Sequence, residues 1–268
     1  MKSKALVVLA IAAMTVFATS CNKLKARDQL NKGVQAFKSA QYPLAVERFK
    51  TAVEYDPTFT TSRLYLAIAY MQQYIPGADS PDNNQMAAAA YDQFQKVLAQ
   101  DPKNELAVGY IASLLFNEKK LDDANQWYQK LVALNPKNKE AFYTLGVIAW
   151  TKAFQPRMEA RAKMGMRPED PGPLKDKKVR AELATTNGPI VEEGLKNLDR
   201  ALQLDPEYDD AMAYENLLLR EKADLEDSQQ AYNDDTKKAD DFVQKSLETR
   251  RIKAERKPAG GGITADTK

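Results

Sequence analysis

Histidine is absent from this 268-residue chain, and Cys21 is its single cysteine. Without histidine the chain cannot build a histidine-based catalytic triad or a histidine-ligated metal site, and it lacks the commonest general base. One cysteine forms neither an internal disulfide nor a zinc site. No glycine-rich nucleotide motif is present, because the glycines at 260–262 lie in a charged tail with no strand before them. The sequence therefore predicts that the protein is not an enzyme and needs no metal or cofactor.

The chain also lacks an excess of either charge, with 39 basic and 37 acidic residues. Lys2 and Lys4 lie in the first 20 residues, which contain no acid, so the remainder carries 37 basic and 37 acidic residues. A neutral balance provides no general attraction to the phosphates of nucleic acids. We therefore expect no nucleic-acid partner.

Four Asp-Pro or Asn-Pro dipeptides recur along the chain at a fixed distance from a small residue. The small, bulky and proline positions are Ala45, Phe49 and Pro57; Ala90, Phe94 and Pro102; Ala124, Tyr128 and Pro136; and Gly194, Leu198 and Pro206. A small residue lets two antiparallel helices approach closely, and the bulky residue four positions later fills the space beside it. Proline then ends the helix. The pattern predicts an all-α fold of helix pairs.

This spacing resembles the second helix of the tetratricopeptide repeat. Residues 105–138 match it without insertion, and copies also begin near residues 26, 60, 139 and 209. The resemblance implies a tetratricopeptide α-solenoid, a superhelix of antiparallel helix pairs with a long inserted excursion and a C-terminal capping helix. The expected boundaries are 26–59, 60–104, 105–138, 139–208, and a degenerate repeat with capping helices over 209–256. We expect this last part to lack a second helix with the motif and to form instead a long polar helical stretch to about Arg256, which is either continuous or broken near Tyr232.

Two copies carry insertions, over 75–86 and 154–189. The acidic and amide side chains of the first could suggest calcium, but their spacing does not fit an EF-hand loop, so a solvated loop is expected. The second is either a degenerate extra hairpin or an excursion with one or two short helices, one of them ending at Asn187-Gly188-Pro189. It is either solvated or a flap that touches lipid headgroups or a partner. Its basic residues and methionines are Arg157, Arg161, Lys163, Arg167, Lys175, Lys177, Lys178, Arg180, Met158, Met164 and Met166.

The N-terminus has the features of a secretory signal over 1–20, with a basic start and an apolar run too short for a comfortable membrane span. Small residues then precede Cys21, and this arrangement resembles a bacterial lipoprotein lipobox. The resemblance implies cleavage before Cys21 and lipidation of Cys21, whereas an ordinary signal cut near Ser20 is the alternative. Asn22 favours the outer membrane. We expect a lipid-anchored protein of the bacterial cell envelope facing the periplasm, with a linker over 21–25 and a disordered tail over 257–268.

In tetratricopeptide proteins the first helix of each pair lines a groove that binds partners. The matching positions here are Val34, Phe37, Ile68, Met71, Phe116, Tyr143, Val147 and Trp150. Aromatic anchors of this kind suit binding hot spots, although the same residues could instead pack under the insertions or the C-terminal helix. The predicted function is a non-enzymatic scaffold or adaptor for protein or peptide partners in the envelope. The alternative is a surface or periplasmic lipoprotein that binds a ligand or glycan.

Overall fold

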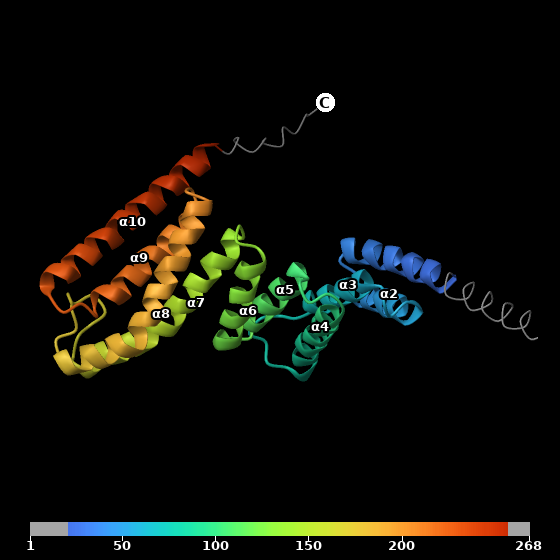
Figure 1. Ribbon diagram of the computed structural model, residues 1–268, viewed down its shortest axis with the longest axis horizontal. Coiled ribbons are helices and arrows are strands. Elements are labelled where there is room, and N and C mark those ends of the chain that lie inside the picture. The colour runs from blue at the N-terminus through green and yellow to red at the C-terminus, as the bar shows by residue number, and fades with distance from the viewer. Residues whose placement is uncertain (1–20, 257–268) are drawn as a thin grey trace, which may run out of the picture. The chain divides into compact units, whose positions relative to one another are not determined.

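The computed structural model describes residues 21–256, and this range is helical with no strand (Figure 1). The predicted all-α fold is thereby confirmed. A helix over 21–38 comes first. The helices that follow are α2 Tyr42–Tyr55, α3 Thr60–Met71, α4 Pro81–Gln100, α5 Glu105–Asn117, α6 Leu121–Leu134, α7 Lys139–Lys163, α8 Lys177–Leu204, α9 Asp209–Ala223 and α10 Gln229–Arg256. The chain divides between Leu134 and Asn135 into two compact units, here the N-terminal and C-terminal units.

The N-terminal unit consists of three helix pairs, in which α3 contacts α4 and α5 contacts α6. We call the earlier member of each pair the first helix and the later member the second helix. The small residues of the repeated pattern are fully buried at Ala45 and Ala90, and so are the bulky residues Phe49 and Phe94. A Cβ added to Gly33 would clash with the ring of Phe49. The pattern thus marks the close contact between the two helices of a pair.

The residue before each repeated proline makes a turn of its own. In all four copies its side-chain oxygen accepts a hydrogen bond from the backbone N–H two residues later, at 3.0–3.3 Å. The four acceptors are Asp56, Asp101, Asn135 and Asp205. Short Asp and Asn side chains favour this turn, which explains why these residue types recur there.

Residues 21–25 are helical, although the sequence predicted a linker there. The segment contains no glycine or proline, and its lysines, leucine and following alanine are good helix formers. Lys25 lies over the ring of Tyr55 in α2, with 5.5 Å between its Nζ and the ring centroid. Packing on α2 therefore extends the first helix to Cys21, which is exposed. Residues 1–20 and 257–268, with the predicted signal and tail, lie outside the described range.

The second insertion, over 154–189, forms neither an extra hairpin nor separate short helices. Instead it lengthens α7 and α8, which continue through Pro156 and Pro189. A proline inside a helix removes one backbone hydrogen bond, but packing across the pair outweighs this loss. The buried Asn187 side chain donates to the carbonyl of Ala153 at 3.0 Å and joins the two helices near both prolines. Only the stretch 164–176 lies outside the two helices.

Three of the eight basic residues of this insertion, Arg157, Arg161 and Arg180, face inward, whereas the other five are exposed. Arg161 is 2% exposed, and its Nη1 lies 2.7 Å from Oδ2 of Asp224 at the end of α9. Arg157 binds Asp224 at 2.9 Å and Glu221 at 2.7 Å. Met166 is also buried, in a small apolar cluster with Leu174. The acids that neutralise these arginines come from α9, far along the sequence.

The predicted long helix to about Arg256 is present as α10, and it completes the last helix pair with α9. α10 is unbroken, including at Tyr232, and packs against α9 (Figure 1). Ala239 and Ser246 are buried on α10, with Val243 between them. Their spacing repeats that of Ala45, Phe49 and Ala52 in the first copy. Because no proline follows, α10 continues for several further turns.

Replacing Gly194 with alanine is expected to lower the free energy of unfolding by about 1–3 kcal/mol. The added Cβ would lie 2.5 Å from the Cβ of Ala149, which sits on the backbone of α7 and cannot turn away. Gly109→Ala is the matched control, since its Cβ would lie 3.5 Å from Leu131, an ordinary contact. The free energy of unfolding of this control variant should rise by about 0.5–1 kcal/mol, because alanine has a higher helix propensity than glycine. Urea unfolding compares the two, and equal effects would contradict the close contact.

Candidate partner-binding surface

The eight predicted groove residues lie on first helices of both units. Val34, Phe37, Ile68, Met71 and Phe116 belong to the N-terminal unit, and Tyr143, Val147 and Trp150 belong to the C-terminal unit. Seven of them are partly exposed, whereas Val147 is only 8% exposed. Val147 therefore contributes to helix packing rather than to an accessible surface.

In the N-terminal unit the predicted positions form an apolar face on neighbouring first helices. α3, which carries Ile68 and Met71, contacts α5, which carries Phe116. Phe37 packs edge-on against Tyr42, with ring centroids 5.4 Å apart. A polar hollow of about 250 Å³ lies beyond the end of α5, between the first insertion and the turn that contains Lys119. This face thus offers apolar contacts and ends beside polar groups.

The first insertion is held in place by the side chain of Asn83. The side chain of Asn83 is buried, accepts from the backbone N–H of Ile75 at 2.7 Å, and donates to the carbonyls of Ile75 and Ala78. Ser80 caps α4 by accepting from the backbone N–H of Asn83 at 3.3 Å. The amide therefore stabilises the loop. Across the described residues no group of three or more His, Cys, Asp or Glu could hold a metal ion.

A hollow of about 530 Å³ lies between the second helices α4 and α6, and the sequence did not indicate it. Leu98, Val108, Trp127 and Leu134 are among its lining residues. Lys130 lies over the ring of Trp127, with its Nζ 4.2 Å from the centroid. Most of the lining residues sit on the second helices α4 and α6, so the groove pattern, which uses first helices, could not have found them.

In the C-terminal unit five rings form a continuous chain, which we call the aromatic ribbon. Its members, in spatial order, are Tyr208, Tyr143, Tyr214, Trp150 and Phe154. Successive ring centroids lie 5.1, 5.5, 5.6 and 5.2 Å apart. Cations lie over the two end rings, Lys139 over Tyr208 and Arg157 over Phe154. Phe154 is 36% exposed and the other four are partly exposed.

The sequence indicated only Tyr143 and Trp150 of this ribbon as site residues. Phe154 follows Trp150 by one helical turn, which was a usable signal. Tyr208 precedes α9 and Tyr214 lies within it, six residues later, a spacing that matches no helical face. These two rings reach the ribbon because α9 packs against α7.

The ribbon keeps neutral phenols beside carboxylates. Burial, with the nearby carboxylates of Glu140 and Asp210, raises the pKa of Tyr208 to about 12. Burial also raises the pKa of Tyr143 and Tyr214, with Asp210 adding to both effects. Phenols with such values stay protonated near neutral pH and can donate hydrogen bonds.

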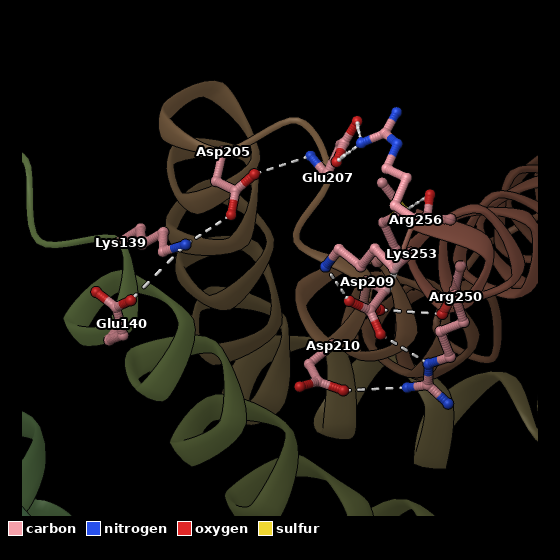
Figure 2. Close-up of polar contacts among 12 residues, drawn as sticks. Lys139, Glu140, Asp205, Glu207, Asp209, Asp210, Arg250, Lys253 and Arg256 are labelled. Atoms are coloured by element: carbon pink, nitrogen blue, oxygen red, sulfur yellow. Dashed lines mark hydrogen bonds and ion pairs between the residues drawn. The ribbon is translucent and has the colours of Figure 1, made fainter. Parts of the chain in front are cut away.

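The C-terminal end of α10 is tied to the start of α9 by ion pairs (Figure 2). Arg250 binds Asp209 at 2.8 Å and Asp210 at 3.0 Å, and Lys253 binds Asp209 at 2.5 Å. Although burial opposes the shift, hydrogen bonds from Lys253 and Arg250 lower the pKa of Asp209. Glu140, on the neighbouring turn of α7, has a side chain that is 67% exposed and lies 3.8 Å from Lys139. Of the acids beside the ribbon, Glu140 is therefore well placed to meet a partner.

Models of the tetratricopeptide repeat family match residues 30–105 and 84–146. The chain is a tetratricopeptide repeat protein. Its solenoid is similar to a crystal structure of MamA, with a TM-score of 0.59 and 16% identity over 88% of this chain and 97% of that one. MamA from Desulfovibrio magneticus RS-1 gives a TM-score of 0.56 and 18% identity over 85% and 96%. YrrB, described as a tetratricopeptide protein with an unusual peptide-binding site, gives 0.55 and 16% over 88% and 97%.

Comparison with curated proteins found no match. The similarity to these solved structures establishes the fold. Tetratricopeptide repeats as a class are protein-interaction modules. Across the described residues no helix is both long and apolar enough to cross a membrane.

Proposed function

We propose that this tetratricopeptide protein is a non-enzymatic scaffold of the bacterial cell envelope, anchored through lipid on Cys21, that binds protein segments along its first helices. The observation that carries the proposal is the set of apolar and aromatic side chains left partly exposed at groove positions of both units, such as Met71, Phe116 and Trp150. Packing within the solenoid does not cover these side chains, and aromatic anchors dominate many binding interfaces. YrrB, of similar fold, is described as having a peptide-binding site, which supports a peptide or protein as partner.

The anchoring part of the proposal rests on Cys21, which is exposed at the start of the described helix. Because residues 21–26 are helical, the five steps from Cys21 to the buried Ala26 span only about 8 Å. A lipidated Cys21 would hold the first helix pair close to the bilayer. Several acyl chains would give stable attachment, since each buried methylene contributes about 0.8 kcal/mol.

Cys21→Ser should move the protein from the membrane fraction to the soluble fraction after expression in a bacterium. The sulfur is the proposed attachment atom, and serine preserves the size of the side chain. Intact-mass spectrometry of the wild type should give a mature chain that begins at Cys21 and carries lipid. If the wild-type chain carries no lipid and fractionates like the Cys21→Ser variant, the lipid anchor is refuted. That result would not bear on the proposed binding surface.

Partner binding can be tested by placing a photo-crosslinking amino acid in the membrane-anchored chain. At Met71 or Phe116 it should capture a defined protein, because both side chains lie on the proposed binding face. At Leu44, which is 37% exposed on the second helix α2, it should capture much less of that protein. Equal capture at the three positions would show that the first-helix face is not the binding surface.

A further inference from the structure

The helix over 21–38, drawn in blue in Figure 1, carries a local excess of positive charge. It contains five basic residues and one acid, whereas residues 39–268 contain 32 basic and 36 acidic residues. The one acid, Asp28, already binds Lys32 at 2.7 Å. The end of the helix next to Cys21 therefore has a positive charge that the rest of this helix does not neutralise.

Three cations lie within six residues of Cys21, at Lys23, Lys25 and Arg27, and all three residues are exposed. Within 21–256 none of them forms an ion pair, and residues 1–20 contain no acid. Lys25 lies over the ring of Tyr55, but a ring face carries no net charge and does not neutralise it. These three charges are therefore free to bind an anionic partner.

Leu24 lies among these cations and is 66% exposed, the largest fraction among the large apolar side chains of residues 21–256. Ala26 is fully buried against the fold, and two residues turn a helix by about 200°, so Leu24 lies on the opposite side of the helix. Cys21 precedes Leu24 by three residues and shares its face. The exposed leucine and the exposed cysteine thus point away from the fold together.

The surroundings of Leu24 suit a flat partner. The two hollows of the N-terminal unit described above are lined by residues of other segments. A helix with an apolar side chain among exposed lysines and arginines, on a face turned away from the protein, is typical of helices that lie at the surface of an anionic bilayer. The observed arrangement therefore favours a lipid surface over a protein side chain.

We propose that the start of the first helix is a contact surface for an anionic bilayer, in which Leu24 enters the boundary between headgroups and acyl chains while Lys23, Lys25 and Arg27 bind lipid phosphates. This proposal rests on the proposed anchor at Cys21 and specifies how the anchored chain meets the membrane. Acyl chains on Cys21 alone would let the protein turn about its attachment point. The additional contact holds the first helix at the bilayer surface.

The cations lie close enough to the proposed anchor to be attracted by the charge of the bilayer. Cys21 and Arg27 are six helical residues apart, about 9 Å along the axis. That distance is similar to the Debye length of about 8 Å at physiological ionic strength, within which surface charge acts. Three cations at this range should favour an anionic over a neutral bilayer on the order of 100-fold.

The test is co-sedimentation of vesicles with the chain 21–268 that carries Cys21→Ser, so that binding comes from the protein surface and not from acyl chains. Phosphatidylcholine vesicles with about one third phosphatidylglycerol should bind this chain at least about tenfold more strongly than phosphatidylcholine alone, and high salt should remove the difference. Leu24→Ser should weaken binding about two- to fivefold, because it removes the inserted apolar side chain. Ile75→Ser, at a side chain that is 64% exposed, is the matched control and should leave binding unchanged.

Changing Lys23, Lys25 and Arg27 together to glutamine should weaken binding to the anionic vesicles at least about tenfold. The matched control makes the same change in net charge by replacing with glutamine three exposed lysines that form no ion pair in the described range, Lys103, Lys137 and Lys237. This control should weaken binding less than about threefold, because its charges lie elsewhere. Circular dichroism checks that every variant is folded.

Equal binding to the two kinds of vesicle, no binding up to about 10 mM lipid, or equal effects of the two triple changes would overturn the proposal. Capture of a defined protein by a photo-crosslinking residue at position 24 of the anchored chain would also overturn it, in favour of a protein partner. If mass spectrometry finds lipid on Cys21 but vesicle binding fails, the proposed function survives and this inference does not. If it finds no lipid, the anchor fails, while vesicle binding by the Cys21→Ser chain still decides this inference.

Discussion

Replacing Arg161 with methionine is expected to lower the free energy of unfolding by about 3–5 kcal/mol, the range for breaking a buried ion pair from one side. Asp224 is 2% exposed and would be left with Arg157 as its remaining arginine partner. The guanidinium also donates to the carbonyl of Arg167 at 2.9 Å and to that of Asp170, so two loop acceptors would lose their donor. The stretch 164–176 should open at the same time.

Urea unfolding gives the stability change, and hydrogen exchange reports on 164–176. Arg251→Ala is the matched control, since Arg251 binds Glu248 at 2.6 Å but both side chains are more than half exposed. An exposed pair of this kind should contribute no more than about 1 kcal/mol. Similar losses for the two variants would show that the buried cluster has no special part in holding the insertion.

Glu215→Gln is expected to stabilise the protein at neutral and alkaline pH. Glu215 is 2% exposed, and one of its carboxyl oxygens has no hydrogen-bond partner. Burial, with the carboxylate of Asp199, raises the pKa of Glu215 to about 8. Its position in α9 corresponds to Leu66, Ile111 and Leu145 in three of the four earlier first helices, all of them buried apolar residues. The acid therefore lies where the fold elsewhere has an apolar side chain.

The sign of the pH dependence follows from proton binding. Between the ordinary pKa of 4.5 and the folded value of about 8, the unfolded chain releases the proton while the folded chain keeps it. Stability therefore falls as pH rises through this window and stays low above it. Glutamine removes this decline. Relative to the wild type, the free energy of unfolding of Glu215→Gln should therefore be almost unchanged at pH 4 and higher by about 2–3 kcal/mol at pH 7.

Asp235→Asn provides a control of opposite sign. Although burial opposes the shift, hydrogen bonds from Lys222 and Lys238 lower the pKa of Asp235. The folded chain therefore gives up this proton more readily than the unfolded chain, so the carboxylate stabilises the fold above its ordinary pKa and this variant should lose stability at pH 7. Unfolding curves at pH 4, 7 and 9 separate the two acids, and a parallel response of both variants would contradict the assignment for Glu215.

The contacts that made the fold predictable are local and repeated. Ala90 and Phe94 lie one turn apart on the same helix, and Pro102 follows at a distance that the chain alone fixes. Each helix pair buries such residues against its own partner, so the sequence pattern reports directly on the contact. The same logic predicted that Met71 and Phe116 lie on first helices, where both are partly exposed. It predicted α10 as a long helix but not as a repeat helix, because Val243 occupies the bulky position and no proline follows.

The insertion and the aromatic ribbon could not be predicted in this way. Arg161 looked like a solvated or lipid-facing base because its partner Asp224 lies 63 residues later. Tyr208 looked like a loop residue because nothing in its spacing links it to Tyr143. Both pairings depend on α9 lying against α7, and a linear pattern carries no information about which side chains two packed helices bring together.

The sequence by itself determined that this chain is a tetratricopeptide solenoid, because the residues that define the repeat contact each other within one helix pair. Tertiary structure alone decided that the insertion at 154–189 extends α7 and α8 and turns three of its four arginines inward. It also decided that five rings from α7, α9 and the turn before α9 lie in contact. The physical reason is how far apart in the sequence the contacting residues lie. Contacts within a helix pair follow from the spacing of residues along the chain, whereas ion pairs and ring contacts between helix pairs depend on how the pairs stack.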